Sequence, residues 1–183
     1  MNRENALQLV KDSVSKENLI KHMLAVEAIM KETAQFLNED AEKWDLVGLL
    51  HDVDFGETEN DMQRHALAAE EILKGKVDEE IIRAIKSHNF ENTKVSPETK
   101  MELALIAADA ISGLVIASAL IIPSKKLSDV KVESITKKFK QKDFARNCNR
   151  EHIMYCEKIG IPKEKFFELS LNALQKISEE LGL

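Results

Sequence analysis

Apolar residues recur at the spacing of an amphipathic α-helix along most of the chain. The segment 15–38 shows this most clearly, because one face carries Leu19, Met23, Val26, Ile29 and Met30. Apolar periodicity and flanking polar, Gly and Pro residues predict helices over residues 5–14, 15–38, 39–51, 65–74, 78–87, 98–122 and 163–181. Residues 55–63 and 89–97 are expected to be loops. The pattern predicts an all-α helical bundle.

Several polar residues are expected to mark helix ends. Ser15, together with Asn18, is typical of a first helical turn, and Asn38 is typical of a stop. Asp78 is a natural N-cap for the helix that follows it. Pro123 is expected to end the most apolar helix, because proline lacks the N–H that continues a helix.

That helix contains a run as long as a membrane span, from Leu103 to Ile122, with Asp109 as its single charge. A charge near the middle of a span costs about 2.5–3.5 kcal/mol. A helix that is apolar on all sides can also be the central helix of a soluble bundle. We expect the buried helix, without membrane insertion, and a carboxylate inside it needs a partner or a metal.

Composition agrees with a folded soluble protein of 183 residues, 44% hydrophobic and 32% charged. Six Gly and three Pro leave few turns for an all-β fold, and a net charge of −6 argues against a duplex-DNA binder. We expect a core over residues 16–122 and a helical C-terminal extension over 123–183, packed as a single structural domain. The extension begins with a basic stretch, 125–146, which has eight basic and three acidic residues.

The two cysteines fit neither a disulfide framework nor a metal knuckle. Cys148 and Cys156 are eight residues apart, and we expect both to be reduced packing residues. The N-terminus leads into no apolar signal core, so the expected location is the cytoplasm.

Four of the five histidines and two aspartates stand at apolar helix faces or at helix ends. In chain order this set is His22, His51, Asp52, His65, His88 and Asp109. A divalent metal accepts neutral imidazole and carboxylate together, and mixed nitrogen and oxygen ligands suit Mn, Fe, Co, Ni or Zn rather than Ca. His152 lies outside this order and is expected to be an ordinary surface or core histidine.

Each member of the set has a simpler explanation when it is taken alone. A histidine on an apolar face is often a hydrogen-bonded core residue, and an aspartate in an apolar helix can pair with a buried Lys or Arg. A single His-Asp dipeptide carries little information. The order of the whole set is what favours a shared metal.

The segments Gly48-Leu49-Leu50-His51-Asp52 and Ile106-Ala107-Ala108-Asp109-Ala110, with His22 before them, resemble the HD superfamily of metal-dependent phosphohydrolases. The resemblance covers about residues 16–122. Arg64-His65-Ala66 and Lys86-Ser87-His88-Asn89 resemble the six-ligand, dinuclear subset of that superfamily. The tail segments Pro123-Ser124-Lys125-Lys126, Lys137-Lys138-Phe139-Lys140 and Phe144-Ala145-Arg146 are similar to one branch of predicted HD hydrolases.

This resemblance implies an HD-domain-like bundle and assigns ligands residue by residue. His22, His51, Asp52 and Asp109 would hold one metal, and Asp52 would bridge to a second metal held by His65 and His88. If only one metal binds, His65 or His88 could act as an acid on the leaving group.

The sequence departs from the superfamily pattern after Asp52. Many HD hydrolases have a Lys or Gly-Lys there, and this chain has Val53-Asp54-Phe55. Asp54 could orient a ligand histidine, or it could be a loop or cap carboxylate.

The implied activity is hydrolysis of a phosphoester by metal-activated water. The substrate would be a nucleotide or another small phosphorylated molecule. Part of the basic stretch could bind its phosphate, or the stretch could be a solvated face. A di-iron oxygenase and a catalytically silent metal-bearing binding module are the alternatives. We expect no stable complex with nucleic acid, and the sequence leaves the oligomeric state open.

Overall fold

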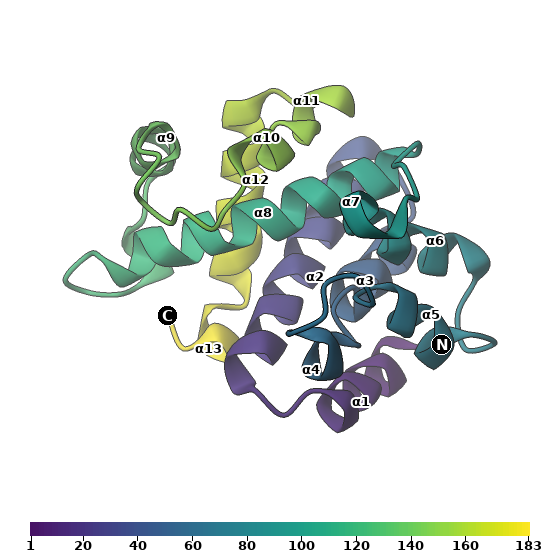
Figure 1. Ribbon diagram of the computed structural model, residues 1–183. Coiled ribbons are helices and arrows are strands. Elements are labelled where there is room, and N and C mark those ends of the chain that lie inside the picture. The colour runs from purple at the N-terminus through teal and green to yellow at the C-terminus, as the bar shows by residue number, and fades with distance from the viewer.

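The computed structural model describes all residues, 1–183, and contains helices and no strand (Figure 1). The predicted all-α class is confirmed. The helices are α1 (Arg3–Ser13), α2 (Glu17–Leu37), α3 (Ala41–Leu50), α4 (Phe55–Thr58), α5 (Leu67–Leu73), α6 (Glu79–His88), α7 (Phe90–Thr93), α8 (Lys100–Leu120), the 3₁₀ helix η1 (Leu127–Asp129), α9 (Val132–Lys140), α10 (Arg150–Ile153), α11 (Tyr155–Lys158), α12 (Lys163–Lys176) and α13 (Ser178–Leu181).

The apolar helix α8 runs through the centre of the molecule (Figure 1). Its neighbours are α2, α6 and α9 to α12, and they cover it on several sides. By length and composition α8 could cross a membrane, but 67% of its apolar window is buried inside the fold. This burial agrees with the expectation that α8 is a core helix of the fold. Its first turn is held by a capping box between Thr99 and Glu102.

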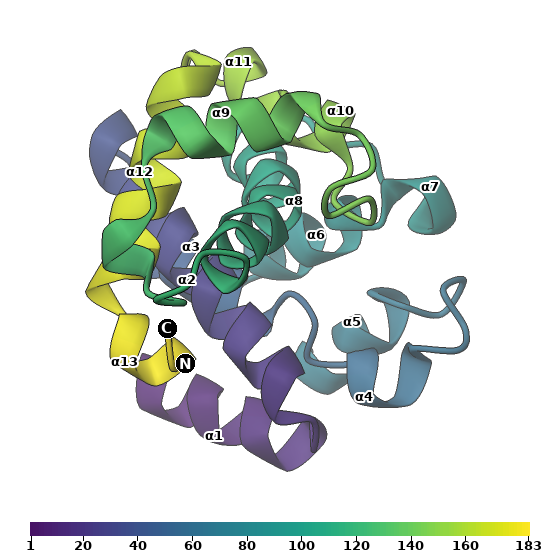
Figure 2. The ribbon, with the colours of Figure 1, turned by 90° about the vertical axis from the view of Figure 1, so that its left-hand side faces the viewer.

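Two long helices from distant parts of the chain flank α8. Helix α2 packs against α3, α8 and α12, so the C-terminal extension lies directly on the segment that contains His22. Figure 2 shows α12 and α13 on one side of α2, and α4 and α5 on the opposite side. The boundary between residues 122 and 123 stays a prediction.

Some local expectations are wrong. Helix α2 begins at Glu17, after its N-cap Lys16, so Asn18 lies in the first turn and Ser15 lies before it. Asp78 is the N-cap of α6, as predicted, although its side chain makes no capping hydrogen bond. The expected loops at 55–63 and 89–97 contain the short helices α4 and α7. The predicted helix 163–181 is interrupted at Ile177, between α12 and α13. Asn38 does end α2, in a left-handed conformation with φ of 56°.

Helices α2 and α3 approach each other closely at Gly48. A Cβ atom at this position would lie 2.7 Å from the Cα of Glu27 and 2.9 Å from the carbonyl oxygen of Val26. Both are backbone atoms that cannot move independently. The absence of a side chain at Gly48 therefore allows His51, at the end of α3, to reach His22 on α2.

We expect Gly48→Ala to lower the free energy of unfolding by about 3 kcal/mol, because the two helix backbones must separate. Urea unfolding followed by circular dichroism measures the change. Gly113→Ala is the matched comparison, since the only close neighbour there is the Cys148 side chain, which can rotate. Equal costs for the two variants would contradict the close helix approach.

Candidate metal centre

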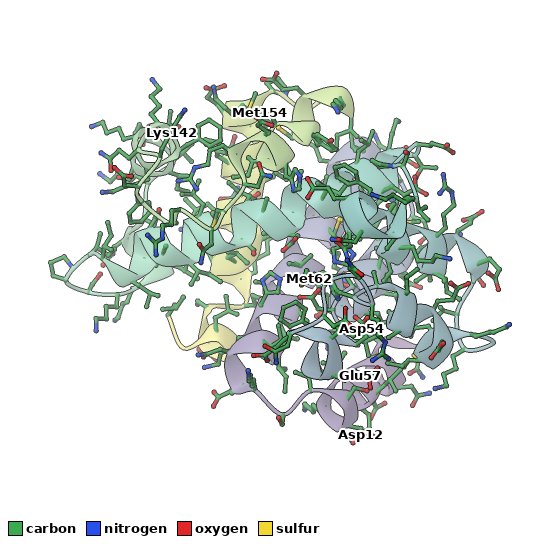
Figure 3. The ribbon with its side chains drawn as sticks, in the orientation of Figure 1. Asp12, Asp54, Glu57, Met62, Lys142 and Met154 are labelled. Atoms are coloured by element: carbon green, nitrogen blue, oxygen red, sulfur yellow. The ribbon has the colours of Figure 1, made fainter.

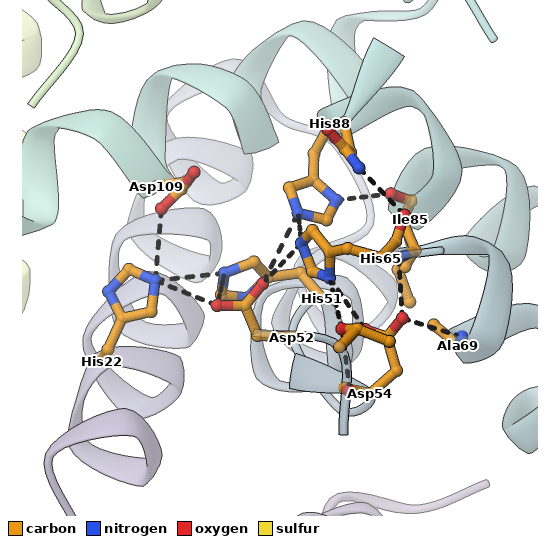
Figure 4. A network of polar contacts seen from close by, with 12 residues as sticks. His22, His51, Asp52, Asp54, His65, Ala69, Ile85, His88 and Asp109 are labelled. Carbon is orange, nitrogen blue, oxygen red and sulfur yellow. Dashed lines mark hydrogen bonds and ion pairs between the residues drawn. The ribbon is translucent and has the colours of Figure 1, made fainter. Parts of the chain in front are cut away.

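The six side chains selected from the sequence meet in one cluster, although they come from five separate parts of the fold (Figure 4). His22 lies on α2, and His51 and Asp52 follow α3 directly. His88 is the last residue of α6, and Asp109 lies in the middle of α8. His65 stands in the turn before α5. The close packing of α2, α3 and α8 brings these positions together.

Asp52 lies at the centre of the cluster and divides it into two halves. Its Oδ2 atom is 3.6 Å from His22 Nε2 and 3.4 Å from His51 Nε2. Its Oδ1 atom is 3.4 Å from His65 Nε2 and 3.5 Å from His88 Nε2. One carboxylate thus faces two pairs of imidazoles, and each half of the cluster includes one of its oxygens.

Asp109 extends the first half. Its Oδ1 atom lies 3.2 Å from His22 Nε2. Its side chain is 37% exposed, so this carboxylate is half-buried although the helix that carries it lies in the core. Asp109 and His22 form the open edge of the cluster, whereas the side chain of His51 is fully buried.

The Nδ1 atoms of the four histidines all face hydrogen-bond acceptors. His51 Nδ1 donates to the carbonyl oxygen of Gly48 at 2.8 Å, and His88 Nδ1 donates to that of Ile85 at 2.5 Å. His22 Nδ1 lies 3.3 Å from the Ser112 hydroxyl, whose own proton goes to the Asp109 carbonyl. These contacts place the proton of each neutral ring on Nδ1 and leave a lone pair on Nε2.

The positions of the four Nε2 lone pairs show whether the residues fit a metal ion. The lone pairs of His22 Nε2 and His51 Nε2 face each other at 3.2 Å, and those of His65 Nε2 and His88 Nε2 at 3.0 Å. Two lone pairs at such distances repel unless a proton or a cation lies between them. Each half offers two imidazole nitrogens and one Asp52 oxygen, and the ligand atoms within each half lie within 4.8 Å of one another. The residues fit a pair of divalent metal ions.

The charges in the cluster also favour a cation. Burial, together with the nearby imidazoles of His22 and His88, lowers the pKa of His51 to about 4, although the carboxylates of Asp52 and Asp109 act in the opposite direction. Burial acts against ionised Asp52, but the imidazoles of His51, His65 and His88 outweigh it and hold the pKa of that carboxyl well below its usual range. Burial is likewise outweighed at His65, where Asp52 and Asp54 raise the pKa to about 9. The site therefore holds an ionised Asp52 at neutral pH, and a metal ion bound by His65 would displace the second proton of that ring.

Asp54 is a buried carboxylate beside the second half, and its contacts agree with both interpretations offered by the sequence. Its Oδ1 atom lies 3.1 Å from His65 Nδ1. Its Oδ2 atom accepts hydrogen bonds from the backbone N–H groups of Ala66 at 2.7 Å and Ala69 at 3.2 Å. Ala66 has a left-handed φ of 70°, a strained conformation for a residue with a Cβ. Asp54 thus orients His65 and holds the turn that carries it.

We expect Asp54→Asn to weaken metal affinity about 10-fold to 100-fold, because an amide no longer fixes the His65 ring through a charged acceptor. Competition with a fluorescent chelator measures the affinity. Asp61→Asn is the control, because Asp61 is exposed and its side chain makes no hydrogen bond or ion pair. Unchanged affinity in Asp54→Asn would contradict the orienting role.

His152, the two cysteines and several basic residues lie outside the cluster. His152 packs against the rings of Phe90 and Tyr155, with centroids 5.7 and 5.8 Å away. Cys148 and Cys156 are free thiols, as predicted. Lys125 and Lys126 follow the far end of α8, which at 1.5 Å per residue ends roughly 16 Å beyond Asp109. Figure 3 places Lys142 beside α9, away from Asp54.

Sequence reasoning missed the contribution of Phe55. Its ring packs edge-on against His65, with centroids 5.1 Å apart. Phe55 also lines a hollow of about 590 Å³ that opens onto His22. The sequence predicted a loop at 55–63, and a loop prediction does not indicate where its side chains point. The turn after Asp54 brings Phe55 to the site.

The fold and the site define a class: an all-α protein in which a central aspartate joins two groups of histidines. Comparison with known protein families identifies the one to which the chain belongs. Residues 19–114 match the HD domain family, and the chain belongs to that family. The HD domain defines a superfamily of metal-dependent phosphohydrolases, as the resemblance in the sequence implied.

One curated relative is similar to part of the chain. It is ribonuclease Y of Lawsonia intracellularis, 32% identical over 98 residues. The match covers 53% of this chain and 18% of that protein. No solved structure matches the chain.

Proposed function

We propose that this protein is a phosphohydrolase that cleaves a phosphomonoester or phosphodiester of a small molecule. The observation that carries the proposal is the position of Asp52 between two imidazole pairs. Mn, Fe, Co, Ni and Zn all suit such mixed ligands. A metal held there lowers the pKa of water toward 7 and neutralises charge on phosphoryl oxygens.

The chain's own residues support this reaction in three ways. His22, His51, Asp52 and Asp109 form one ligand group, and Asp52, His65 and His88 form the other. Asp54 keeps the proton of His65 on Nδ1, so that Nε2 faces the site. The burial of His51 and His65 keeps bulk water away from one side, while the Asp109 edge admits substrate.

The test is a phosphoester panel assayed with purified protein supplied with each candidate metal in turn. It contains nucleoside phosphates, sugar phosphates, p-nitrophenyl phosphate, bis-p-nitrophenyl phosphate and a short RNA, the last because the relative is a ribonuclease. We expect turnover of at least one small ester that Asp52→Ala lacks, and no stable complex with the RNA. The absence of turnover across the panel would contradict the proposal.

The paired ligand groups also suit a di-iron oxygenase, and the same protein tests this second candidate. A coloured, iron-loaded protein that consumes oxygen with a polyol or phosphonate and cleaves no phosphoester would favour the oxygenase. Metal binding with neither activity would favour the silent binding module. The cytoplasmic location is part of the proposal, and fractionation of cells that express the protein tests it.

A further inference from the structure

The metal cluster is closed on most sides. The side chains of His51, His65 and His88 are 0%, 3% and 5% exposed. His22 and Asp109, at 25% and 37%, are the accessible members. A substrate whose phosphoryl group lies at the cluster must therefore extend outward past His22.

The hollow that opens onto His22 lies on this path. It measures about 590 Å³, which is room for a ring-sized group, and its lining combines apolar and polar side chains. The residues that matter for recognition are Lys16, Asn18, Leu19, His22, Phe55 and Glu59. Leu19 and Phe55 offer apolar contact for the carbon face of a ring, and Asn18 offers a donor and an acceptor.

The charges in the hollow are balanced. Lys16 is the one Lys or Arg of the lining, and its ammonium group is paired with the Glu59 carboxylate. The second carboxylate, that of Glu17, is paired with Lys21 at 2.9 Å. No unpaired cation is present there to bind a second phosphate, and no unpaired anion to bind an amine.

We propose that this hollow binds the alcohol part of the phosphoester, and that the balanced Lys16–Glu59 pair selects an uncharged ring such as a sugar or nucleoside. The inference rests on the proposed phosphohydrolase function. Lys16 and Glu59 are specificity residues that contact the leaving group, and they take no part in the chemical step. Removing either partner leaves the other as an uncompensated charge.

Three aryl phosphates test this subsite: phenyl phosphate, 4-carboxyphenyl phosphate and 4-(aminomethyl)phenyl phosphate. The wild-type protein is expected to show similar KM values for the two charged compounds. Lys16→Gln is expected to raise KM for the carboxylate about fivefold and to lower it for the amine, because Glu59 is then unpaired. Glu59→Gln is expected to do the reverse, with kcat within about twofold in both variants.

The Lys100–Glu39 pair supplies the matched control. Its Nζ–Oε1 distance is 2.9 Å, and it joins the same residue types at a hollow that includes no residue of the metal cluster. Lys100→Gln and Glu39→Gln are expected to leave all three KM values unchanged. Melting temperatures of the four variants show whether any KM shift comes from damage to the fold.

A purely structural Lys16–Glu59 pair predicts equal losses of stability and no separation of the charged substrates, and that result would overturn the inference. A wild-type preference for one charged compound would overturn it as well. So would turnover of other phosphoesters with none of the three aryl phosphates cleaved at millimolar concentration, because the hollow is large enough for each. No turnover of any phosphoester would instead contradict the phosphohydrolase function itself.

Discussion

Asp52→Ala is expected to abolish phosphoester turnover, with a loss of about 1,000-fold or more, and to remove stabilisation by metal. The two Asp52 oxygens face both imidazole pairs, so this one change weakens both halves of the cluster. Several kcal/mol of transition-state stabilisation are lost with the ions. Steady-state rates and melting temperatures, with and without added metal, measure the two effects.

The stability part of this prediction follows from mass action. A ligand present at 1,000 times its Kd stabilises the folded state by about 4 kcal/mol. The wild-type protein is therefore expected to melt at a lower temperature after treatment with a chelator. Asp52→Ala should show no such difference, and a metal-dependent melting temperature in this variant would refute the bridging role of Asp52.

His88→Ala is expected to leave one metal ion per chain and to lower turnover about 100-fold. His88 belongs to the half of the cluster that contains His65 and has no contact with Asp109. The other half keeps all four of its ligands, and one bound ion retains part of the electrostatic stabilisation. Metal analysis of the purified variant, together with its kcat, measures this effect.

His152→Ala is the matched control for that experiment. His152 is the fifth histidine of the chain, and it packs against Phe90 and Tyr155 outside the cluster. Its replacement is expected to change neither metal content nor kcat. Loss of both metals in His88→Ala would show that the two halves do not bind independently.

The central cluster could be predicted because its members stand at positions that a helical pattern defines. His22 lies on the apolar face of α2, and His51 and His88 lie at the C-terminal ends of α3 and α6. Buried polar groups at such positions require partners, and the order of the residues identified them as partners of one another. The structure brings all six together, while their roles as ligands stay a prediction.

The surroundings of the cluster could not be predicted, because they depend on contacts between distant segments. The Asp54 carboxylate contacts His65, and the next residue, Ala66, adopts a left-handed conformation that the helical pattern does not predict. Lys16 pairs with Glu59 across 43 positions of the chain, and periodicity gives no information about such a pair. The same limit applies to helix ends, since α2 begins at Glu17 rather than at Ser15.

The most direct test of the metal centre is the metal content of the wild-type chain. Protein purified without chelator or affinity metal is analysed by elemental mass spectrometry beside Asp52→Ala. We expect a dinuclear centre, with two transition-metal ions per wild-type chain and fewer than one in the variant. No bound metal in the wild-type protein, even after incubation with manganese, would contradict it.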